Sequence, residues 1–367
     1  MLRGNEPREL AREFDYEGLT DLYDSLCGDA DRYTYFREIS GRFDTDHLKL
    51  MRMLYLGDII PTDETWEVKH ERLLSLLEKC GLLHKSAGGI SLGGFALYRY
   101  RGIWIFADAP QVSPVLYYGL DSIGLASRLG AIPGGSALDL CSGPGIQALI
   151  LGASGMKVTS VDINPLASRL CELNSKINGL DGYIAIKTAD LYDGINGEFD
   201  LITVNPPLLP VPNGVPYPFI GDGGADGLEL TLNIINGAGE RLSKSGSLLM
   251  IGMTPLTSGL PSQVETIELE LERSGLYGIM TILNTYETLP GSEWIAGIAS
   301  TSFYHAPARY DNLNAAQSEV ADLYVRAGIE EVCTFVLRAW REGDALQGNL
   351  RVINYSGIED ANGPWLL

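Results

Sequence analysis

The sequence predicts an α/β protein organised around a mostly parallel β-sheet, and two observations lead to this fold class. From Ala137 onward, short apolar runs alternate with segments of helical spacing, which is the pattern of βαβ units. Four of the runs end in polar signals, namely Asp139 with the glycines after it, Asp162, Asp190, and an Asn-Pro-Pro turn at residues 205–207. Ligands of such sheets bind beyond the carboxyl ends of the strands. We therefore expect the four signals to converge at one edge.

The elements of this part follow in chain order from the apolar spacing. Strands are predicted at residues 137–140, 156–162, 184–190, 199–205, 247–253, 276–283 and 332–340. Helices are predicted at residues 145–152, 164–180, 227–242 and 264–274, and Asp226 with Glu229 has the spacing of a capping box for the third helix. Residues 284–314 have no clear periodicity, and we predict a long loop there, of a kind that is often functional.

Residues 1–109 are predicted to form a separate N-terminal unit, and residues 110–367 the main domain. Helical spacing occurs at residues 19–26, 47–55 and 66–80, and strand-like runs follow at 90–102 and 103–108. Helices followed by a hairpin resemble a winged-helix arrangement. Such a unit can bind DNA, but these helices are rich in Asp and Glu, so we favour a packing or dimerisation module and keep a homodimer open.

Composition and charge narrow the function classes. No apolar run approaches the ~20 residues of a membrane-spanning helix, so no membrane partner is expected. The formal net charge of −20 disfavours nucleic acid, because proteins that grip phosphates need a basic face. The N-terminus shows no apolar signal-peptide core, and the five cysteines are scattered without a Cys-x-x-Cys pair. We expect a cytoplasmic protein without a metal.

The turn after the first strand suits a nucleotide-like ligand. Residues 143–148 match G-x-G-x-x-G/A, and glycine lets the backbone approach a ligand without a Cβ. Asp162 ends the second strand, where it can accept hydrogen bonds from both ribose hydroxyls. NAD and S-adenosylmethionine (SAM) both carry this ribose, so the two features leave both cofactors open. The Tyr117-Tyr118 pair could roof such a ligand or be plain packing.

Three further features favour SAM. A carboxylate at Asp139, four residues before Gly143, suits the ammonium group of SAM and would repel a pyrophosphate. Asp190-Leu191 ends the third strand, where it can take the adenine amino group and cover the ring. The Asn-Pro-Pro turn ends the fourth strand, where NAD enzymes have no such requirement.

These residues resemble those of class I SAM-dependent methyltransferases whose fourth strand ends in Asn-Pro-Pro-aromatic. They are most similar to HemK-type glutamine-amide methyltransferases and their relatives that act on RNA or DNA amino groups. The resemblance covers about residues 117–253 and includes a glycine-rich segment at 223–228. It implies a Rossmann-like sheet with an antiparallel last strand, and SAM as cofactor. By this resemblance the cofactor site comprises Tyr118, Asp139, Cys141, Ser142, Gly143, Gly145, Asp162, Ile163, Asn164, Asp190, Leu191 and Asn205, and the acceptor nitrogen is held by Asn205, Pro206 and Pro207.

The chemistry of the Asn-Pro-Pro turn supports the acceptor assignment. Each proline lacks an N–H and holds the preceding residue extended, so the turn presents carbonyl oxygens and few donors. The Asn205 side-chain oxygen and the Pro206 carbonyl can accept both hydrogens of an –NH₂ group and aim its lone pair at the sulfonium methyl. The next residue is Leu208, where the family usually has an aromatic that stacks on a flat acceptor. Tyr217 or Phe219 is a candidate to supply that wall.

The leading hypothesis is SAM-dependent N-methylation of an amine or amide on a protein or a small metabolite. Three alternatives stay open. One is a base N-methyltransferase acting on RNA or DNA, which the charge and Leu208 argue against. Another is a methyltransferase-fold protein that converts or merely binds SAM. The last is methylation of a hydroxyl or a carboxylate, since Asn205 could also orient an oxygen acceptor.

Overall fold

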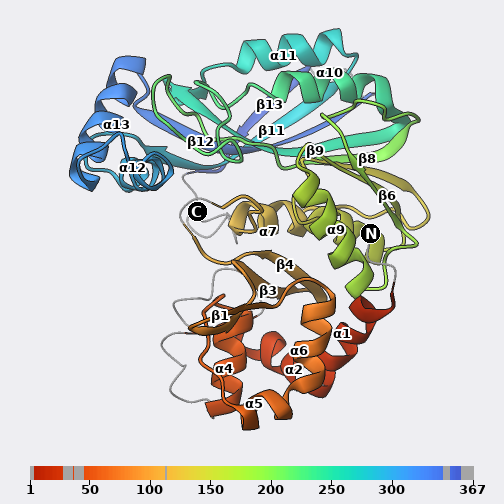
Figure 1. The fold of residues 1–367 in the computed structure, drawn as a ribbon. Coiled ribbons are helices and arrows are strands. Elements are labelled where there is room, and N and C mark those ends of the chain that lie inside the picture. The colour runs from red at the N-terminus through yellow and green to blue at the C-terminus, as the bar shows by residue number, and fades with distance from the viewer. Residues whose placement is uncertain (1–3, 28–35, 37–44, 112–113, 342–347, 357–367) are drawn as a thin grey trace.

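The fold is a sheet flanked by helices, with an N-terminal helical unit on one side (Figure 1). The computed structural model describes residues 4–27, 36, 45–111, 114–341 and 348–356. The main sheet has the strand order β13-β11-β12-β9-β8-β5-β6-β7. Its strands are β5 (Ser136–Leu140), β6 (Lys157–Asp162), β7 (Ile184–Thr188), β8 (Phe199–Val204), β9 (Leu242–Thr257), β11 (Tyr277–Glu287), β12 (Glu331–Trp340) and β13 (Leu350–Asn354), with a short β10 (Leu260–Pro261) beside β9.

The strand directions confirm a mostly parallel sheet whose last predicted strand is antiparallel. β5 pairs in parallel with β6 and β8, and the β6–β7 and β8–β9 pairs are parallel as well. β12 lies antiparallel between β9 and β11. The edge strand β13, parallel to β11, is one that the sequence analysis does not predict. Because β5, β6, β7 and β8 run in one direction, their carboxyl ends share one edge of the sheet.

Helices cover both faces of this sheet. α7 (Leu120–Ser127), α8 (Ile146–Ala153) and α9 (Pro165–Ile177) lie on the face toward the N-terminal unit, and α10 (Thr231–Arg241) and α11 (Val264–Arg273) lie on the other (Figure 1). α9 starts at Pro165, whose missing N–H costs nothing in the first turn of a helix. The Asn164 side chain caps it by accepting from the N–H of Leu166 at 2.9 Å.

The N-terminal unit consists of helices followed by two hairpins, where the sequence predicts helices followed by one. Its elements are α1 (Glu6–Tyr16), α2 (Leu19–Leu22) with a π-helical turn (Tyr23–Cys27), α4 (Thr45–Leu54), α5 (Glu64–Lys69), α6 (Glu71–Lys79), β1 (His84–Ser86), β2 (Gly89–Ser91), β3 (Phe95–Tyr100) and β4 (Ile103–Asp108). Ile60, between α4 and α5, bridges to Ile90 of β2 and ties the helices to the first hairpin.

Two asparagines, one within α9 and one directly after it, join the N-terminal unit to the main domain. Asn178 accepts from the backbone N–H of Trp104 at 2.9 Å and donates to its carbonyl at 2.7 Å, much as a neighbouring strand would pair with β4. Asn174 does the same with Phe106, at 2.8 and 2.9 Å, and also donates to the carbonyl of Pro144 at 2.9 Å. One buried apolar cluster runs from α1 through β4 into α8 and α9. The two parts therefore share a core.

The predicted loop at residues 284–314 is wrong, because this stretch holds the end of β11, all of α12 (Glu293–His305) and the start of α13 (Leu313–Ala327). Ser292 caps α12 by accepting from the N–H of Ile295 at 3.3 Å. Small residues such as Ala and Ser alternate with bulky ones around α12, so the apolar spacing that would mark a helix is blurred.

Two helix boundaries also differ from prediction. The predicted helix at 66–80 is split at His70 into α5 and α6, and the buried His70 ring packs on Trp66 and lies 2.9 Å from Oε2 of Glu17. The helix expected from residue 227 begins at Thr231. Asp226 accepts from the N–H of Leu228 at 3.0 Å, so it closes a turn before the helix and does not cap it.

Candidate functional site

The four polar signals lie at the carboxyl ends of neighbouring strands, as the sequence predicts. Asp139 is the next-to-last residue of β5, and Asp162 is the last residue of the adjacent β6. Asp190 follows β7, and Asn205 follows β8 on the other side of β5. Burial raises the pKa of the Cys141 thiol, and the carboxylates of Asp162, Asp139 and Asp190 raise it further. The three aspartates are therefore all near enough to Cys141 to affect its thiol.

Asp139 carries a buried carboxylate with one oxygen available. The residue is 1% exposed, and its Oδ2 accepts from the N–H of Ala148 in α8 at 3.0 Å. No residue in the described part of the chain donates to its Oδ1. Burial raises the pKa of Asp139 well above the ordinary carboxyl value, and the nearby Asp162 raises it further. An ammonium group at Oδ1 would offset both costs.

The two glycines of the turn between β5 and α8 have different tasks. Gly143 has φ +53°, and no described heavy atom lies within 4 Å of where its Cβ would be. Gly145 has φ +94°, and a Cβ there would lie 2.5 Å from Sγ of Cys171 on α9. The first glycine therefore leaves space at the sheet edge, and the second lets α8 pack closely against α9.

Asp162 organises the same turn. Its Oδ2 accepts from the N–H of Gly143 and its Oδ1 from the N–H of Asn164, both at 2.8 Å. Burial raises the pKa of Asp162, and these two backbone hydrogen bonds lower it. Each oxygen retains a lone pair for a further donor. The side chain is thus both a brace for the glycine turn and a candidate partner for ligand hydroxyls.

Two residues at this edge adopt backbone conformations that residues other than glycine rarely take. Cys141 has φ +53° and Leu191 has φ +42°. Such conformations cost on the order of 1–3 kcal/mol and concentrate at ligand sites. Asp190 is exposed and Leu191 is half-buried, so both can meet a ligand at the β7 end of the edge.

The remaining predicted cofactor residues differ in burial and in their contacts. Ser142 is buried, and its N–H donates to a carbonyl of β6 at 3.1 Å. Ile163 is 51% exposed directly after β6, whereas Asn164 is engaged in capping α9. Tyr118 is buried, with its ring 5.0 Å from that of Tyr98 in the N-terminal unit. Tyr118 and Asn164 therefore have structural contacts of their own.

Asn205 is held by side chains of α7. Its Nδ2 donates to Oδ2 of Asp121 at 2.9 Å and lies 3.3 Å from Oγ of Ser122. Its Oδ1 is buried, and no described residue donates to it. Pro206 is buried and Pro207 half-buried. The turn therefore has a preset side-chain oxygen that can accept a hydrogen bond.

The glycine-rich segment at 223–228 packs against the residues that leave the Asn-Pro-Pro turn. Leu209 donates to the carbonyl of Gly221 at 2.9 Å and accepts from the N–H of Gly223 at 3.0 Å. A Cβ on Gly223 would lie 2.8 Å from the carbonyl carbon of Leu208, and one on Gly227 would lie 2.3 Å from the carbonyl oxygen of Met253. Glycine is required here so that backbone can press on backbone.

The helices α12 and α13, which the sequence analysis missed, support the proline-rich loop beyond the turn. The Tyr324 hydroxyl of α13 donates to the carbonyl of Pro210 at 2.7 Å. Tyr217 is half-buried and its hydroxyl interacts with Thr301 of α12, whereas Phe219 is 70% exposed. Of the two predicted wall residues, Tyr217 is therefore the one that is fixed in place.

Asp121 and Ser122 are functional candidates that sequence reasoning did not identify. They lie 84 and 83 positions before Asn205, and only the packing of α7 against α8 and β9 brings them together. Gln147 of α8 helps to fix α7 by donating to the carbonyl of Ser122 at 3.2 Å. The only local signal is an acidic residue in the first turn of a helix, which is common to many helices.

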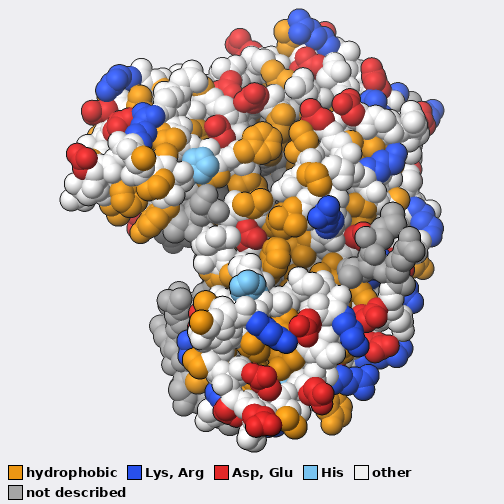
Figure 2. All heavy atoms as spheres, viewed as in Figure 1, with side chains coloured by type: hydrophobic (Ala, Val, Ile, Leu, Met, Phe, Trp, Pro, Cys, Tyr) orange, Lys and Arg blue, Asp and Glu red, His pale blue; other side chains and the backbone are white. Residues whose placement is uncertain are grey.

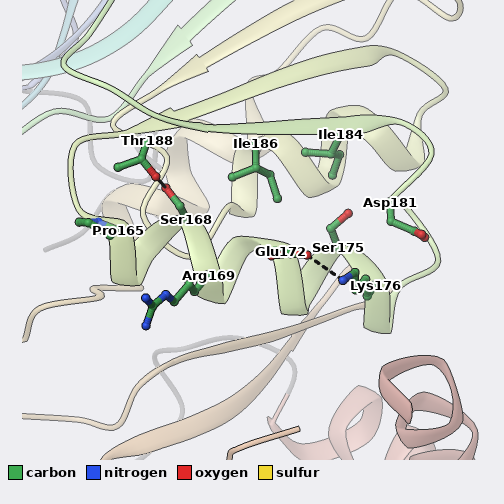
Figure 3. A pocket seen from close by; sticks show the side chains of 10 residues that line it. All are labelled: Pro165, Ser168, Arg169, Glu172, Ser175, Lys176, Asp181, Ile184, Ile186 and Thr188. Carbon is green, nitrogen blue, oxygen red and sulfur yellow. Dashed lines mark hydrogen bonds and ion pairs between the residues drawn. The ribbon is translucent and has the colours of Figure 1, made fainter. Parts of the chain in front are cut away.

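A separate groove of about 650 Å³ lies between α9 and the edge strand β7 (Figure 3). Its walls carry mixed charges and include the Glu172–Lys176 ion pair of 2.7 Å. None of its ten lining residues is a predicted site residue. Among the described residues, no cluster of His, Cys, Asp or Glu is arranged to hold a metal ion, and no helix is long and apolar enough to span a membrane.

The residues at the sheet edge fit SAM in three respects. Asp139 has a buried oxygen to which no described group donates, which suits an ammonium. Gly143 leaves open space beside the Asp162 carboxylate, where a ribose could lie. The Asn205 oxygen to which no described group donates is at the end of the strand next to β5.

Comparison with known proteins agrees with this geometry. Residues 121–269 match the family model described as "Methyltransferase small domain". A protein of Methanocaldococcus jannaschii named as a protein N5-glutamine methyltransferase is 32% identical over 152 residues, which are 40% of this chain and 74% of that protein.

Two bacterial relatives cover less. The ribosomal protein uL3 glutamine methyltransferase of Neisseria gonorrhoeae is 32% identical over 43% of this chain and 56% of its own. The release factor glutamine methyltransferase of Borreliella burgdorferi is 32% identical over 31% of this chain and 43% of its own. The chain thus spans about three quarters of the archaeal relative and about half of these two.

Proposed function

Because this chain belongs to the class I SAM-dependent methyltransferases, in the methyltransferase small domain family and resembling the HemK type, we propose that it methylates the side-chain amide nitrogen of a glutamine in a protein. The observation that carries the proposal is the state of Asn205. Its Nδ2 is engaged by Asp121, and its buried Oδ1 is left to accept. A carboxamide –NH₂ is a donor of matching chemistry.

The residues at the turn orient such an acceptor. Oδ1 of Asn205 and the carbonyl of Pro206 accept its two hydrogens, which fixes the amide plane so that the nitrogen lone pair, perpendicular to that plane, can face the methyl group. SAM supplies a methyl group already activated by its sulfonium, so the chain needs no nucleophile of its own. Positioning alone can contribute several kcal/mol to lowering the barrier. The new nitrogen–carbon bond would form as the bond from the sulfonium sulfur to the methyl breaks, so that S-adenosylhomocysteine leaves and the nitrogen releases one proton to water.

Charge supports a protein acceptor over a nucleic acid. The chain has a net charge of −20. On the face drawn in Figure 2, the Lys and Arg side chains of the described residues are interspersed with Asp and Glu. A phosphate backbone would need a continuous basic surface. The two bacterial relatives are named as enzymes that act on proteins, a ribosomal protein for one and a release factor for the other.

The test follows a labelled methyl group. The protein is incubated with methyl-labelled SAM and a cell lysate that is then separated into protein, nucleic acid and small molecules. We expect the label in the protein fraction. Acid hydrolysis of that fraction should release it as methylamine, because the N-methylated amide of glutamine hydrolyses to glutamate and methylamine. Methylated lysine or arginine would survive hydrolysis as an amino acid, and label in that form or in nucleic acid would contradict the proposal.

A further inference from the structure

The role proposed for the Asn-Pro-Pro turn depends on the orientation of the Asn205 side-chain amide. An asparagine can present either its oxygen or its –NH₂ to a substrate, since the two ends have nearly the same shape. Only the oxygen can accept from the –NH₂ of a glutamine. With the amide reversed, two donors would face each other and the acceptor would not be held.

We infer that Asp121 is the positioning residue that sets this orientation, with Tyr117 and Ser122 supporting it. This inference rests on the proposed function. A carboxylate is an acceptor only, so it admits the –NH₂ end of Asn205 and rejects the oxygen end. The contact in the structure is of that kind, from Nδ2 of Asn205 to Oδ2 of Asp121 at 2.9 Å.

Because Asp121 is buried, it strongly favours the orientation that places the –NH₂ end of Asn205 against its carboxylate. Asp121 is 8% exposed, so water cannot replace a lost partner easily. Reversing the Asn205 amide would place its oxygen against the carboxylate and would leave Nδ2 pointing toward the space where Oδ1 now lies. Both changes leave buried polar groups without partners, which is unfavourable by more than one hydrogen bond. The Ser122 hydroxyl, 3.3 Å from Nδ2, adds a second and weaker contact.

Tyr117 also lies against this carboxylate. Burial raises the pKa of Asp121, and the hydrogen bond from Asn205 and the contact with the Tyr117 hydroxyl lower it. Burial, and after it the neighbouring Asp121, raises the pKa of Tyr117 well above its ordinary value, so the hydroxyl keeps its proton and can donate. The Tyr117 hydroxyl and Nδ2 of Asn205 therefore both lie against the Asp121 side chain, and Oδ1 of Asn205 is left to face the acceptor.

The main test is a double-mutant cycle on the rate of methyl transfer in a single turnover at saturating SAM. Asp121→Ala should slow transfer by on the order of 10²-fold, as expected for a misplaced reactant, and leave SAM affinity within about twofold. Because Asp121 acts through Asn205, the double variant Asp121→Ala/Asn205→Ala should be no slower than Asn205→Ala. Ser122→Ala should have a smaller effect than Asp121→Ala, and Asp121→Glu, which restores a carboxylate, should recover part of the rate.

Two outcomes of the cycle would overturn the inference. One is a double variant slowed by the product of the two single effects, which would show that Asp121 acts independently of Asn205. The other is a loss of SAM affinity in Asp121→Ala that accounts for the slower transfer. A failure of the wild-type protein to methylate any glutamine would instead contradict the proposed function.

A readout without turnover keeps the two failures distinct. In protein labelled with [¹⁵N]asparagine, the side-chain –NH₂ signals of Asn205 are assigned by their loss in Asn205→Ala. We expect these protons to exchange slowly with water in the wild type and faster in Asp121→Ala. Equal exchange in the two proteins would overturn the positioning role even if glutamine is methylated.

Discussion

The two halves of the sheet edge are built in different ways. In the cofactor half, Asp162 braces a glycine turn 19 positions away, and Asp139 contacts a backbone N–H 9 positions away. In the acceptor half, Asn205 depends on a residue 84 positions away. The loop that follows it is held by Tyr324, 114 positions from its partner Pro210.

The cofactor half therefore depends on local sequence patterns, and the acceptor half depends on long-range packing. The cofactor half is formed by consecutive strand–turn–helix units, so any chain with this pattern positions those carboxylates. The acceptor half is assembled from α7, the exit loop and α12–α13, which have no local relation in sequence. SAM binding should therefore survive substitutions in the acceptor half that abolish methyl transfer.

The largest effect is expected for Asn205→Ala. Loss of the oriented oxygen should reduce turnover by on the order of 10²-fold or more, because the acceptor is no longer aligned. SAM affinity, measured by calorimetry, should remain nearly intact. Survival of turnover would show that the amide is not held by this side chain.

Asp162→Ala should have the opposite signature. It removes hydrogen bonds to a carboxylate, so SAM binding should weaken by about 1.5–3 kcal/mol. Calorimetry measures this change directly, and Asp190→Ala, which removes an exposed carboxylate at the same edge, is the matched comparison with a smaller expected loss. Unchanged affinity in Asp162→Ala would remove it from the ribose assignment.

What the sequence could predict follows the same division. The parallel strands and the positions of Asp139 and Asp162 follow from local patterns, and the antiparallel direction of β12 follows from the family resemblance. Asp121 and the α12 helix do not. The first acquires its partner only through packing, and the second hides its helical spacing among small residues.

Asn174 is a residue of the cofactor half that contacts both the glycine turn and the N-terminal unit. Its substitution therefore tests whether long-range contacts also matter for SAM binding. Asn174→Ala leaves the carbonyl of Pro144 and both backbone groups of Phe106 without this partner, so unfolding should become easier by about 1–3 kcal/mol. Asn178→Ala removes the equivalent contacts to Trp104 but none to the glycine turn. Urea titration should therefore show a smaller loss for Asn178→Ala, and only Asn174→Ala should weaken SAM binding. Equal affinity losses would mean that Pro144 is not the connection.

The smallest effect is a pH dependence from Asp139. In the free protein its raised pKa keeps part of the population protonated, whereas an ammonium partner favours the carboxylate. SAM affinity should thus rise with pH, by at most about tenfold per pH unit, between the ordinary carboxyl pKa of about 3.9 and the raised value. Over the same window the free protein should become less stable as pH rises, because its folded state binds the proton more tightly than its unfolded state.

Calorimetry in buffers of different ionisation enthalpy measures the proton released on binding. Asp139→Asn cannot release one from this position and is the control. Equal proton release from the wild type and Asp139→Asn would assign the effect to another group.

The most direct test of the two-part edge is the single-turnover rate of methyl transfer as SAM is raised to saturation in Asp162→Ala and in Asn205→Ala. We expect Asp162→Ala to approach the wild-type rate once SAM saturates, because its defect is in cofactor affinity. Asn205→Ala should stay slow at every SAM concentration. Recovery of Asn205→Ala by SAM, or failure of Asp162→Ala to recover, would contradict the division of the edge into a cofactor half and an acceptor half.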